Sequence, residues 1–282
     1  MPAILECVPN ISEGRDLEKV EKIVDAIRTT KGVKLLDYSS DKDHNRSVIT
    51  FLGEPNAVAE AALKLAKAAT ELIDMSTHTG GHPRMGAVDV MPLIPIKDIT
   101  IEETIELSKK LAESIANECN MHVTLYENSA SAPHRQNLAD IRRGQYEVMA
   151  EKIKEDMWIP DYGPNEFNPK AGMVAVGARP PLIAYNINLS TDDVKIAKNI
   201  ANVIRSAKGG FVFCKAMGLL IEETGKAQVS MNLVNPDYTT IFRVFDMVER
   251  EAHRYGVSVT DSEIVGLVPM KALIDTAIYH LK

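Results

Sequence analysis

Residues 182–210 read LIAYNINLSTDDVKIAKNIANVIRSAKGG, and the fold prediction starts from this stretch. The short, mainly apolar run 182–189 predicts a β-strand. Ser190, Thr191 and Asp192 follow, and these are residue types that cap the start of a helix. The predicted helix runs to about Ala207 and is ended by the glycine pair at 209–210. A strand followed directly by a helix predicts an α/β arrangement.

The sequence after this stretch completes a recognisable order of elements. Apolar runs at 211–220 and 227–233 predict two strands around the turn EETGK. A helix is predicted for 238–255 before Gly256, and residues 257–259 open a last strand. The resulting order β-α-β-β-α-β is that of a ferredoxin-like split βαβ sandwich.

The first half predicts the same order of elements, with an extension. Apolar residues at three- and four-residue spacing predict an amphipathic helix at 17–29. Pro92 and Pro95 make the strand predicted at 88–96 an edge strand or an interrupted one. The other predicted elements are strands at 3–8, 33–38, 47–52 and 122–126 and helices at 57–73 and 101–119. We therefore expect an α/β (α+β) protein with two tandem ferredoxin-like split βαβ subdomains, residues 1–178 and 179–282.

Composition excludes several classes of function for this chain of 282 residues. Hydrophobic residues make up 45% and charged residues 25%, the balance of a globular protein with a real core. The net charge of −7 disfavours nucleic acid and anionic membranes as partners. No signal peptide and no membrane-spanning run is visible, so a cytoplasmic location is expected. Cys7, Cys119 and Cys214 are too scattered for a disulfide framework or a zinc site.

The segment HTGGHPRMG, residues 78–86, is the most informative for chemistry. His78 and His82 are four residues apart, but Gly80, Gly81 and Pro83 forbid a helix that would present both to a metal. We therefore expect no metal. A histidine on a rigid glycine-flanked loop is suited to general acid–base catalysis, because its pKa lets it take and give a proton near neutrality. The alternative is a surface histidine in a glycine turn.

Three other segments leave alternatives open. The stretch SSDKDHNR at 39–46 is most simply a solvated polar turn. Arg135, Arg142 and Arg143 either bind a carboxylate or lie on the surface of a helix. The long loop 158–172, WIPDYGPNEFNPKAG, is typical of a functional loop. The glycine-rich phosphate-binding motifs and the GxSxG motif of serine hydrolases are absent.

Together these segments resemble the formiminotransferase family, whose full name is glutamate formimidoyltransferase. The resemblance covers residues 5–279 and is carried by CVPNISEGR, DHNRSVITFLG, HPRMGAVDVMPLIPI, LYENSA with IRRGQYE, PDYGPNEFNPKAG, VGARPPLIAYNINL, AQVSMNL and IVGLVPMKALID. It implies transfer of a formimino group from N-formimino-L-glutamate to tetrahydrofolate, with 5-formiminotetrahydrofolate and L-glutamate as products. It also implies a homodimer and makes His82 the catalytic acid–base. The residues implied to contact folate are Gly163, Pro164, Asn165, Glu166, Phe167, Asn168, Pro169, Lys170, Ala171 and Gly172.

This chemistry agrees with the residues. The N5 amine of tetrahydrofolate must lose a proton while the departing glutamate amine gains one, and one histidine can carry it without a metal. Arg46, Arg84 and Arg179 are candidates for binding substrate carboxylates. Many members of the family have an acidic residue before the catalytic histidine, where this chain has Gly81, so Asp37, Asp41 or Asp89 is expected to orient His82 instead.

Two rival functions stay open at this stage. One is a glutamate formyltransferase that uses 5-formyltetrahydrofolate, since formyl and formimino groups differ only by O against NH. The other is a folate-binding protein without catalysis. Within the loop, Phe167 supplies either an aromatic contact to folate or a plug at the junction between the two halves.

Overall fold

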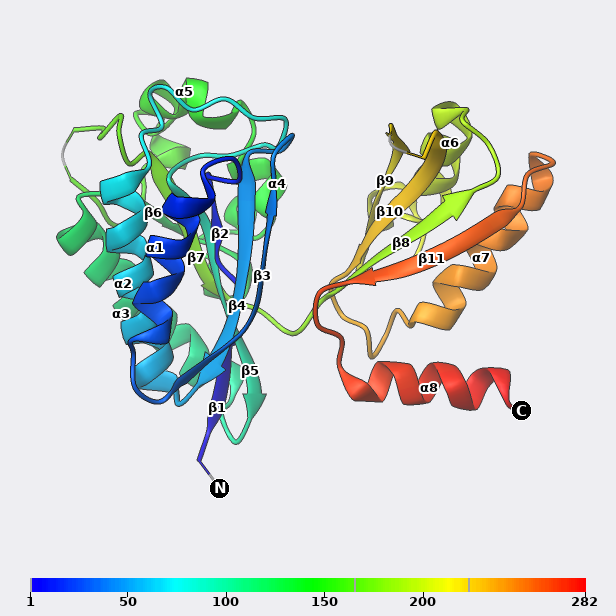
Figure 1. Ribbon diagram of the computed structural model, residues 1–282, viewed down its shortest axis with the longest axis horizontal. Coiled ribbons are helices and arrows are strands. Elements are labelled where there is room, and N and C mark those ends of the chain that lie inside the picture. Colours follow the sequence, from blue (N-terminus) through cyan, green and yellow to red (C-terminus); the bar gives the residue numbers. More distant parts are fainter. Residues whose placement is uncertain (1, 165, 223) are drawn as a thin grey trace. The chain divides into compact units, whose positions relative to one another are not determined.

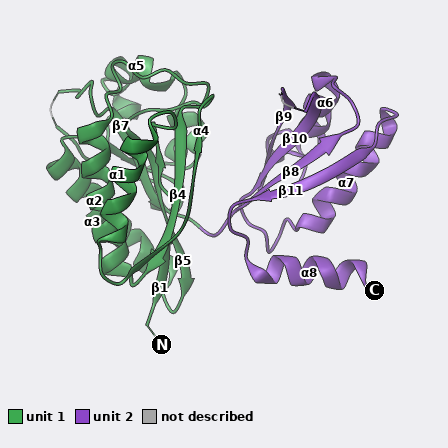
Figure 2. Cartoon of the chain, viewed as in Figure 1, with its two compact units in different colours: residues 1–179 green, residues 180–282 purple. Residues whose placement is uncertain are grey.

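The computed structural model describes residues 2–164, 166–222 and 224–282, so Asn165 of the predicted folate loop lies outside the described residues. The chain forms two compact units, residues 1–179 and 180–282 (Figure 2). The division falls one residue after the boundary expected from the sequence, and Arg179 belongs to the first unit. No helix in the described parts of the chain is long and apolar enough to span a membrane.

The second unit is a four-stranded antiparallel sheet with the strand order β11-β8-β10-β9. Its elements are β8 (Ile183–Leu189), α6 (Val194–Ile204), β9 (Cys214–Ile221), β10 (Lys226–Leu233), α7 (Ile241–Arg254), β11 (Val259–Val265) and α8 (Met270–His280). Alternate residues of β8 are buried, and they share one core with the apolar faces of α6 and α7. The order confirms the ferredoxin-like prediction for this half.

Helix α8 follows this sandwich and was not predicted from the sequence. None of its residues is buried, which explains why its apolar pattern gave no clear signal. It contacts α7, where the Tyr279 ring stacks on Phe242 with 4.2 Å between centroids. The Tyr279 hydroxyl also donates a hydrogen bond of 2.9 Å to Asp246.

The first unit repeats this order and extends it. Its sheet runs β3-β4-(β1, β2)-β5-β7-β6, and β1 and β2 act as two parts of one interrupted strand. Its elements are β1 (Ile4–Cys7), β2 (Asn10–Ile11), α1 (Leu17–Arg28), β3 (Val33–Asp41), β4 (Arg46–Gly53), α2 (Pro55–Leu72), β5 (Val88–Lys97), α3 (Ile101–Cys119), β6 (His122–Leu125), α4 (Leu138–Ile141), α5 (Gln145–Lys152) and β7 (Met173–Ala178). The strands β7 and β6 are added in parallel to β5, so the two-sandwich prediction is confirmed with this extension.

The prediction that the strand at 88–96 is an edge or interrupted strand was wrong. Strand β5 is continuous and central, with β1 and β2 on one side and β7 on the other. Pro92 lies opposite the break between β1 and β2, and there its carbonyl accepts a hydrogen bond from Val8. Pro95 lies beyond the last register pair of β5 with β7. Neither position therefore needs a backbone N–H, which is what proline lacks.

The two faces of this sheet are covered differently. Helices α1, α2 and α3 pack side by side on one face and share the main core with residues such as Cys7, Phe51 and Leu93 (Figure 1). On the other face a smaller core forms around Met85, Val90 and residues of α4 and α5. Strand β5 supplies residues to both cores, because successive side chains point to opposite faces.

Candidate active site

The loop 78–86 is held by the turn between β3 and β4. The Gly81 amide donates to the Asp43 carbonyl at 3.0 Å, and the Asn45 side chain donates to the Thr79 carbonyl at 2.9 Å. A Cβ at Gly80 would lie only 2.3 Å from the His44 carbonyl oxygen, so this close approach requires glycine. The polar turn is thus a support for the loop, which the simpler interpretation as a solvated turn had missed.

His82 is half-buried, and its nearest polar neighbour is Arg46 at the start of β4. Nη1 of Arg46 lies 2.6 Å from Nε2 of His82. A guanidinium can only donate, so Nε2 accepts this bond and the proton of the neutral ring sits on Nδ1. The His44 ring lies edge-on to His82 with 5.8 Å between centroids.

The electrostatic surroundings of His82 favour its neutral form. Burial, followed by the positive charges of Arg46 and Arg142, lowers the pKa of His82 to about 3. His82 is therefore a neutral imidazole at physiological pH. Such a ring can accept a proton once its Nε2 is released from Arg46.

None of the acids expected to orient His82 is seen to bond to it. Asp41 instead accepts two hydrogen bonds from His44, one from the backbone amide and one from Nδ1, both at 2.8 Å. Asp89 is 1% exposed, pairs with Arg142 and accepts the Met85 amide at 3.0 Å. Among the described residues, the side chain that hydrogen-bonds to His82 is that of Arg46. The two carboxylates bond instead to His44 and Arg142.

Arg84 packs behind the loop against the start of α5. It is 7% exposed and donates to both carboxylate oxygens of Glu147, to Gln145 and to His78. These bonds occupy its donors and lock the loop to α5. A substrate carboxylate at Arg84 stays a prediction, but it would have to displace Glu147.

Arg179, the third candidate for binding substrate carboxylates, lies at the end of β7. Its backbone amide donates to the Leu93 carbonyl at 3.0 Å, and its side chain bonds to the buried hydroxyl of Tyr126. Burial raises the pKa of Glu6, and the positive charge of Arg179 opposes this rise. Arg179 therefore belongs to a polar group with Glu6 and Tyr126, and its contact with a substrate also stays a prediction.

The predicted folate loop is anchored at its C-terminal end to the segment that follows His82. Gly86 and Gly172 form an isolated β-bridge, and the Met173 amide donates to the Met85 carbonyl at 3.0 Å. A Cβ at Gly172 would lie 2.4 Å from that carbonyl oxygen, so glycine is required at this close approach. Two segments far apart in the sequence are thus brought together, and the folate contacts of the loop stay a prediction.

Within this loop the side chains form a further set of anchors. The Asn168 amide donates to the Asn120 carbonyl at 2.9 Å, and Lys170 donates to the Glu71 carbonyl at 2.9 Å. The Phe167 ring stacks on His122 with 5.7 Å between centroids and lies 6.1 Å from the Tyr146 ring. The described contacts of Phe167 therefore lie inside the first unit. Pro164 is half-buried, and Gly163, Glu166 and Pro169 are exposed, while Ala171 is buried.

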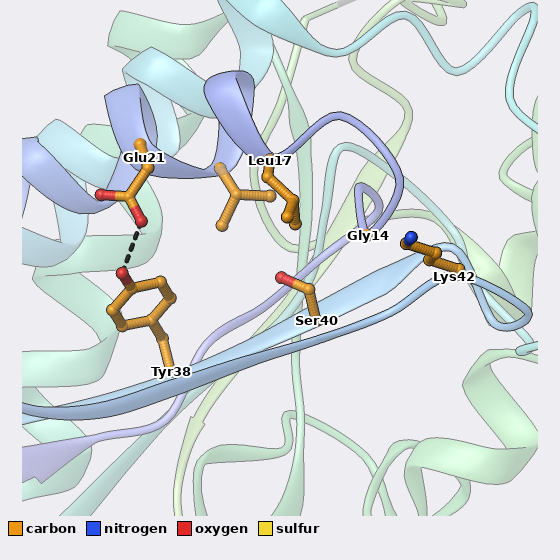
Figure 3. A pocket seen from close by; sticks show the side chains of 7 residues that line it. Gly14, Leu17, Glu21, Tyr38, Ser40 and Lys42 are labelled. Carbon is orange, nitrogen blue, oxygen red and sulfur yellow. Dashed lines mark hydrogen bonds between the residues drawn. The ribbon is translucent and has the colours of Figure 1, made fainter.

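A separate cavity of about 380 Å³ lies between α1 and β3 (Figure 3). Leu17 and Val20 give it apolar walls, and the Tyr38 hydroxyl donates to Glu21 at 2.5 Å across it. None of the predicted site residues lines it.

Metal-ligating residue types do not gather in the described part of the chain. Across residues 2–164, 166–222 and 224–282, no three His, Cys, Asp or Glu side chains form a group that could hold a metal ion. The three cysteines are buried, and burial raises the pKa of Cys119 and Cys214 to about 11. These thiols are therefore protonated at neutral pH and are poor nucleophiles.

Comparison with known proteins covers both units. Residues 4–179 match the family model described as the formiminotransferase domain, N-terminal subdomain, and residues 184–282 match the formiminotransferase domain. The whole chain is 51% identical to a glutamate formimidoyltransferase of Streptococcus pyogenes serotype M1, of which it covers 94%. It is 46% identical to that of Thermoplasma acidophilum, with 99% of the chain and 93% of the relative covered. It is also 43% identical to a formimidoyltransferase-cyclodeaminase of Mus musculus. That match covers 99% of this chain and 53% of the relative.

Proposed function

The chain belongs to the formiminotransferase family, and we propose that it transfers the formimino group of N-formimino-L-glutamate to tetrahydrofolate. The observation that supports this most directly is the position of His82. A neutral, half-buried imidazole lies on a loop that is bridged to the predicted folate loop. The products are L-glutamate and 5-formiminotetrahydrofolate, and tetrahydrofolate acts as a co-substrate.

In the proposed mechanism His82 moves one proton between two nitrogens. N5 of tetrahydrofolate attacks the amidine carbon and forms a C–N bond, and the proton lost from N5 passes to Nε2 of His82. The same proton then goes to the glutamate nitrogen as its bond to that carbon breaks. A correctly placed general acid–base contributes about 10²–10⁴ to the rate.

We assign folate contacts to the loop 163–172. The support is its connection to His82 through Gly86 and Gly172 and its aromatic side chain, Phe167, against His122. Binding there would bring the pterin to the side of the sheet on which the His82 loop lies. A homodimer and a cytoplasmic location, both expected above, remain predictions of this proposal.

The transfer is tested by mixing the protein with tetrahydrofolate and N-formimino-L-glutamate and acidifying the mixture. We expect 5,10-methenyltetrahydrofolate absorbance, with one ammonia released per folate converted. Parallel reactions with N-formyl-L-glutamate test the formyl rival. Absorbance with the formyl donor alone would favour that rival, and no absorbance with either donor would leave only folate binding.

A further inference from the structure

A buried charge cluster beside His82 contains more positive than negative charge. The side chains of Arg142 and Asp89 are 16% and 1% exposed and form an ion pair, and Arg46 is half-buried next to them. The other oxygen of Asp89 accepts the Met85 amide, so each oxygen of this carboxylate already accepts one hydrogen bond. Asp89 therefore pairs with Arg142, while Arg46 feels the charges of Asp89 and Asp41 without an ion pair to either among the described contacts.

Neither arginine has a full set of anionic hydrogen-bond acceptors among the described residues. Nε of Arg142 is buried and has no hydrogen-bond partner among the described residues. The recorded side-chain acceptor of Arg46 is the neutral ring of His82. Burial and then the charge of Arg142 lower the pKa of Arg46, and the negative charges of Asp89 and Asp41 only partly oppose this. A buried cluster of this kind is suited to binding an anion.

We propose that Arg46 and Arg142 bind the α-carboxylate of the amino-acid substrate, and that Arg142 is a specificity-determining residue. The inference rests on the proposed function and concerns the same site. In N-formimino-L-glutamate only one carbon separates the α-carboxylate from the nitrogen that leaves. A carboxylate between the two guanidinium groups therefore places that nitrogen close to Nε2 of His82. The side-chain carboxylate is too far along the substrate to do the same.

This binding mode also activates His82. The guanidinium of Arg46 donates a hydrogen bond to Nε2 of His82, the atom that must accept the proton from the folate. A substrate carboxylate draws Arg46 away, frees Nε2 and adds a negative charge that raises the pKa of His82. The charged and titratable groups around His82 are Arg46 and Arg142, with His44 at its edge and Asp41 and Asp89 behind them.

The test compares the binding of L-glutamate with that of its two amides by calorimetry. Isoglutamine lacks the α-carboxylate charge, and L-glutamine lacks the side-chain charge. The variant Arg142→Gln should bind L-glutamate about 10- to 100-fold more weakly and should no longer discriminate against isoglutamine. It should still discriminate against L-glutamine. Arg143→Gln, whose side chain is 79% exposed and pairs with Asp140, is the matched control and should bind like the wild type.

Arg142→Gln leaves the buried Asp89 without its ion-pair partner and could unfold the unit. The double variant Asp89→Asn with Arg142→Gln removes both charges, and it should show the same loss of discrimination with a normal thermal melt. Titration of His82 by NMR should show that L-glutamate raises its pKa in the wild type and much less in the double variant.

Wild-type affinity for L-glutamate in the folded double variant would overturn the proposal. Weaker binding that still discriminates against isoglutamine would overturn it as well, because the α-carboxylate would then lie elsewhere. These outcomes are independent of the proposed function, which fails if the wild type transfers no formimino group even though it binds L-glutamate through Arg142.

Discussion

The close approach of Gly80 to the β3–β4 turn gives a sharp test of how the His82 loop is positioned. The substitution Gly80→Ala adds a Cβ that would lie 2.3 Å from the His44 carbonyl oxygen and 2.9 Å from Cβ of Asn45. Backbone atoms cannot step aside as a flexible side chain can, so the loop itself must move. Ordinary contact requires a displacement of about 1 Å, and a misplacement of about 1 Å near a reacting group costs about 100-fold in rate.

The matched control is the next residue. A Cβ at Gly81 would lie 3.4 Å from the Asp43 carbonyl oxygen, and this contact needs at most a small adjustment. We expect Gly80→Ala to lower kcat about 100-fold and to cost about 1–3 kcal/mol of stability through overpacking. Gly81→Ala should retain most of the wild-type kcat and most of the wild-type stability.

The assay measures kcat and KM for both substrates together with a thermal melt for each variant. A loss of kcat much larger than the loss of stability is expected for Gly80→Ala, because the strain lies in the loop that carries His82. If Gly80→Ala and Gly81→Ala proved equally active, the turn would not position the loop as argued.

Three further predictions follow from other parts of the first unit. A folate analogue should slow hydrogen exchange at 163–168. Exchange at 171–173 should not change, because these backbone amides already donate hydrogen bonds within the protein. Unchanged exchange throughout 163–168 would place the folate elsewhere. Arg135→Gln breaks a buried pair with Asp161 and should cost about 3–5 kcal/mol in urea unfolding, so a loss below about 1 kcal/mol would refute this role. Below pH 6.5 the unfolded chain protonates His82 while the folded chain, with its pKa of about 3, does not. The free energy of unfolding should therefore decrease more steeply in the wild type than in His82→Asn as the pH is lowered from about 6.5 towards 3. Equal slopes of the free energy of unfolding against pH in the two proteins would contradict the lowered pKa.

The sequence predicted those elements whose apolar periodicity is regular. The strands and helices of both sandwiches were found in the correct order, because each buries one face and shows it as a repeat of two or of about 3.6 residues. The proline rule failed for β5, because Pro92 and Pro95 fall where neighbouring strands offer no acceptor. That depends on register, which is a tertiary property. The short helices α4 and α5 and the exposed α8 carry too little buried surface to show such a pattern.

In the site, too, features set by neighbouring residues in the sequence could be predicted, and features set by tertiary packing could not. The glycines and proline around His82 mark a rigid loop in the sequence itself. The roles of the three arginines after β6 could not be told apart, since all three stand in one polar segment. In the structure Arg135 is a buried anchor of residues 157–161, Arg142 pairs with the buried Asp89 and lowers the pKa of His82 by its charge, and Arg143 is exposed on the surface. Only the packing of α4 against the sheet separates these roles.

The central claim is that His82 carries the proton during formimino transfer. The most direct measurement is the single-turnover rate of His82→Ala with saturating tetrahydrofolate and N-formimino-L-glutamate, with folate-analogue binding measured on the same protein. We predict a rate about 10²–10⁴ lower than the wild type, nearly unchanged folate-analogue binding and partial rescue by added imidazole. A variant that binds the analogue normally and keeps more than about half of the wild-type rate would contradict the claim.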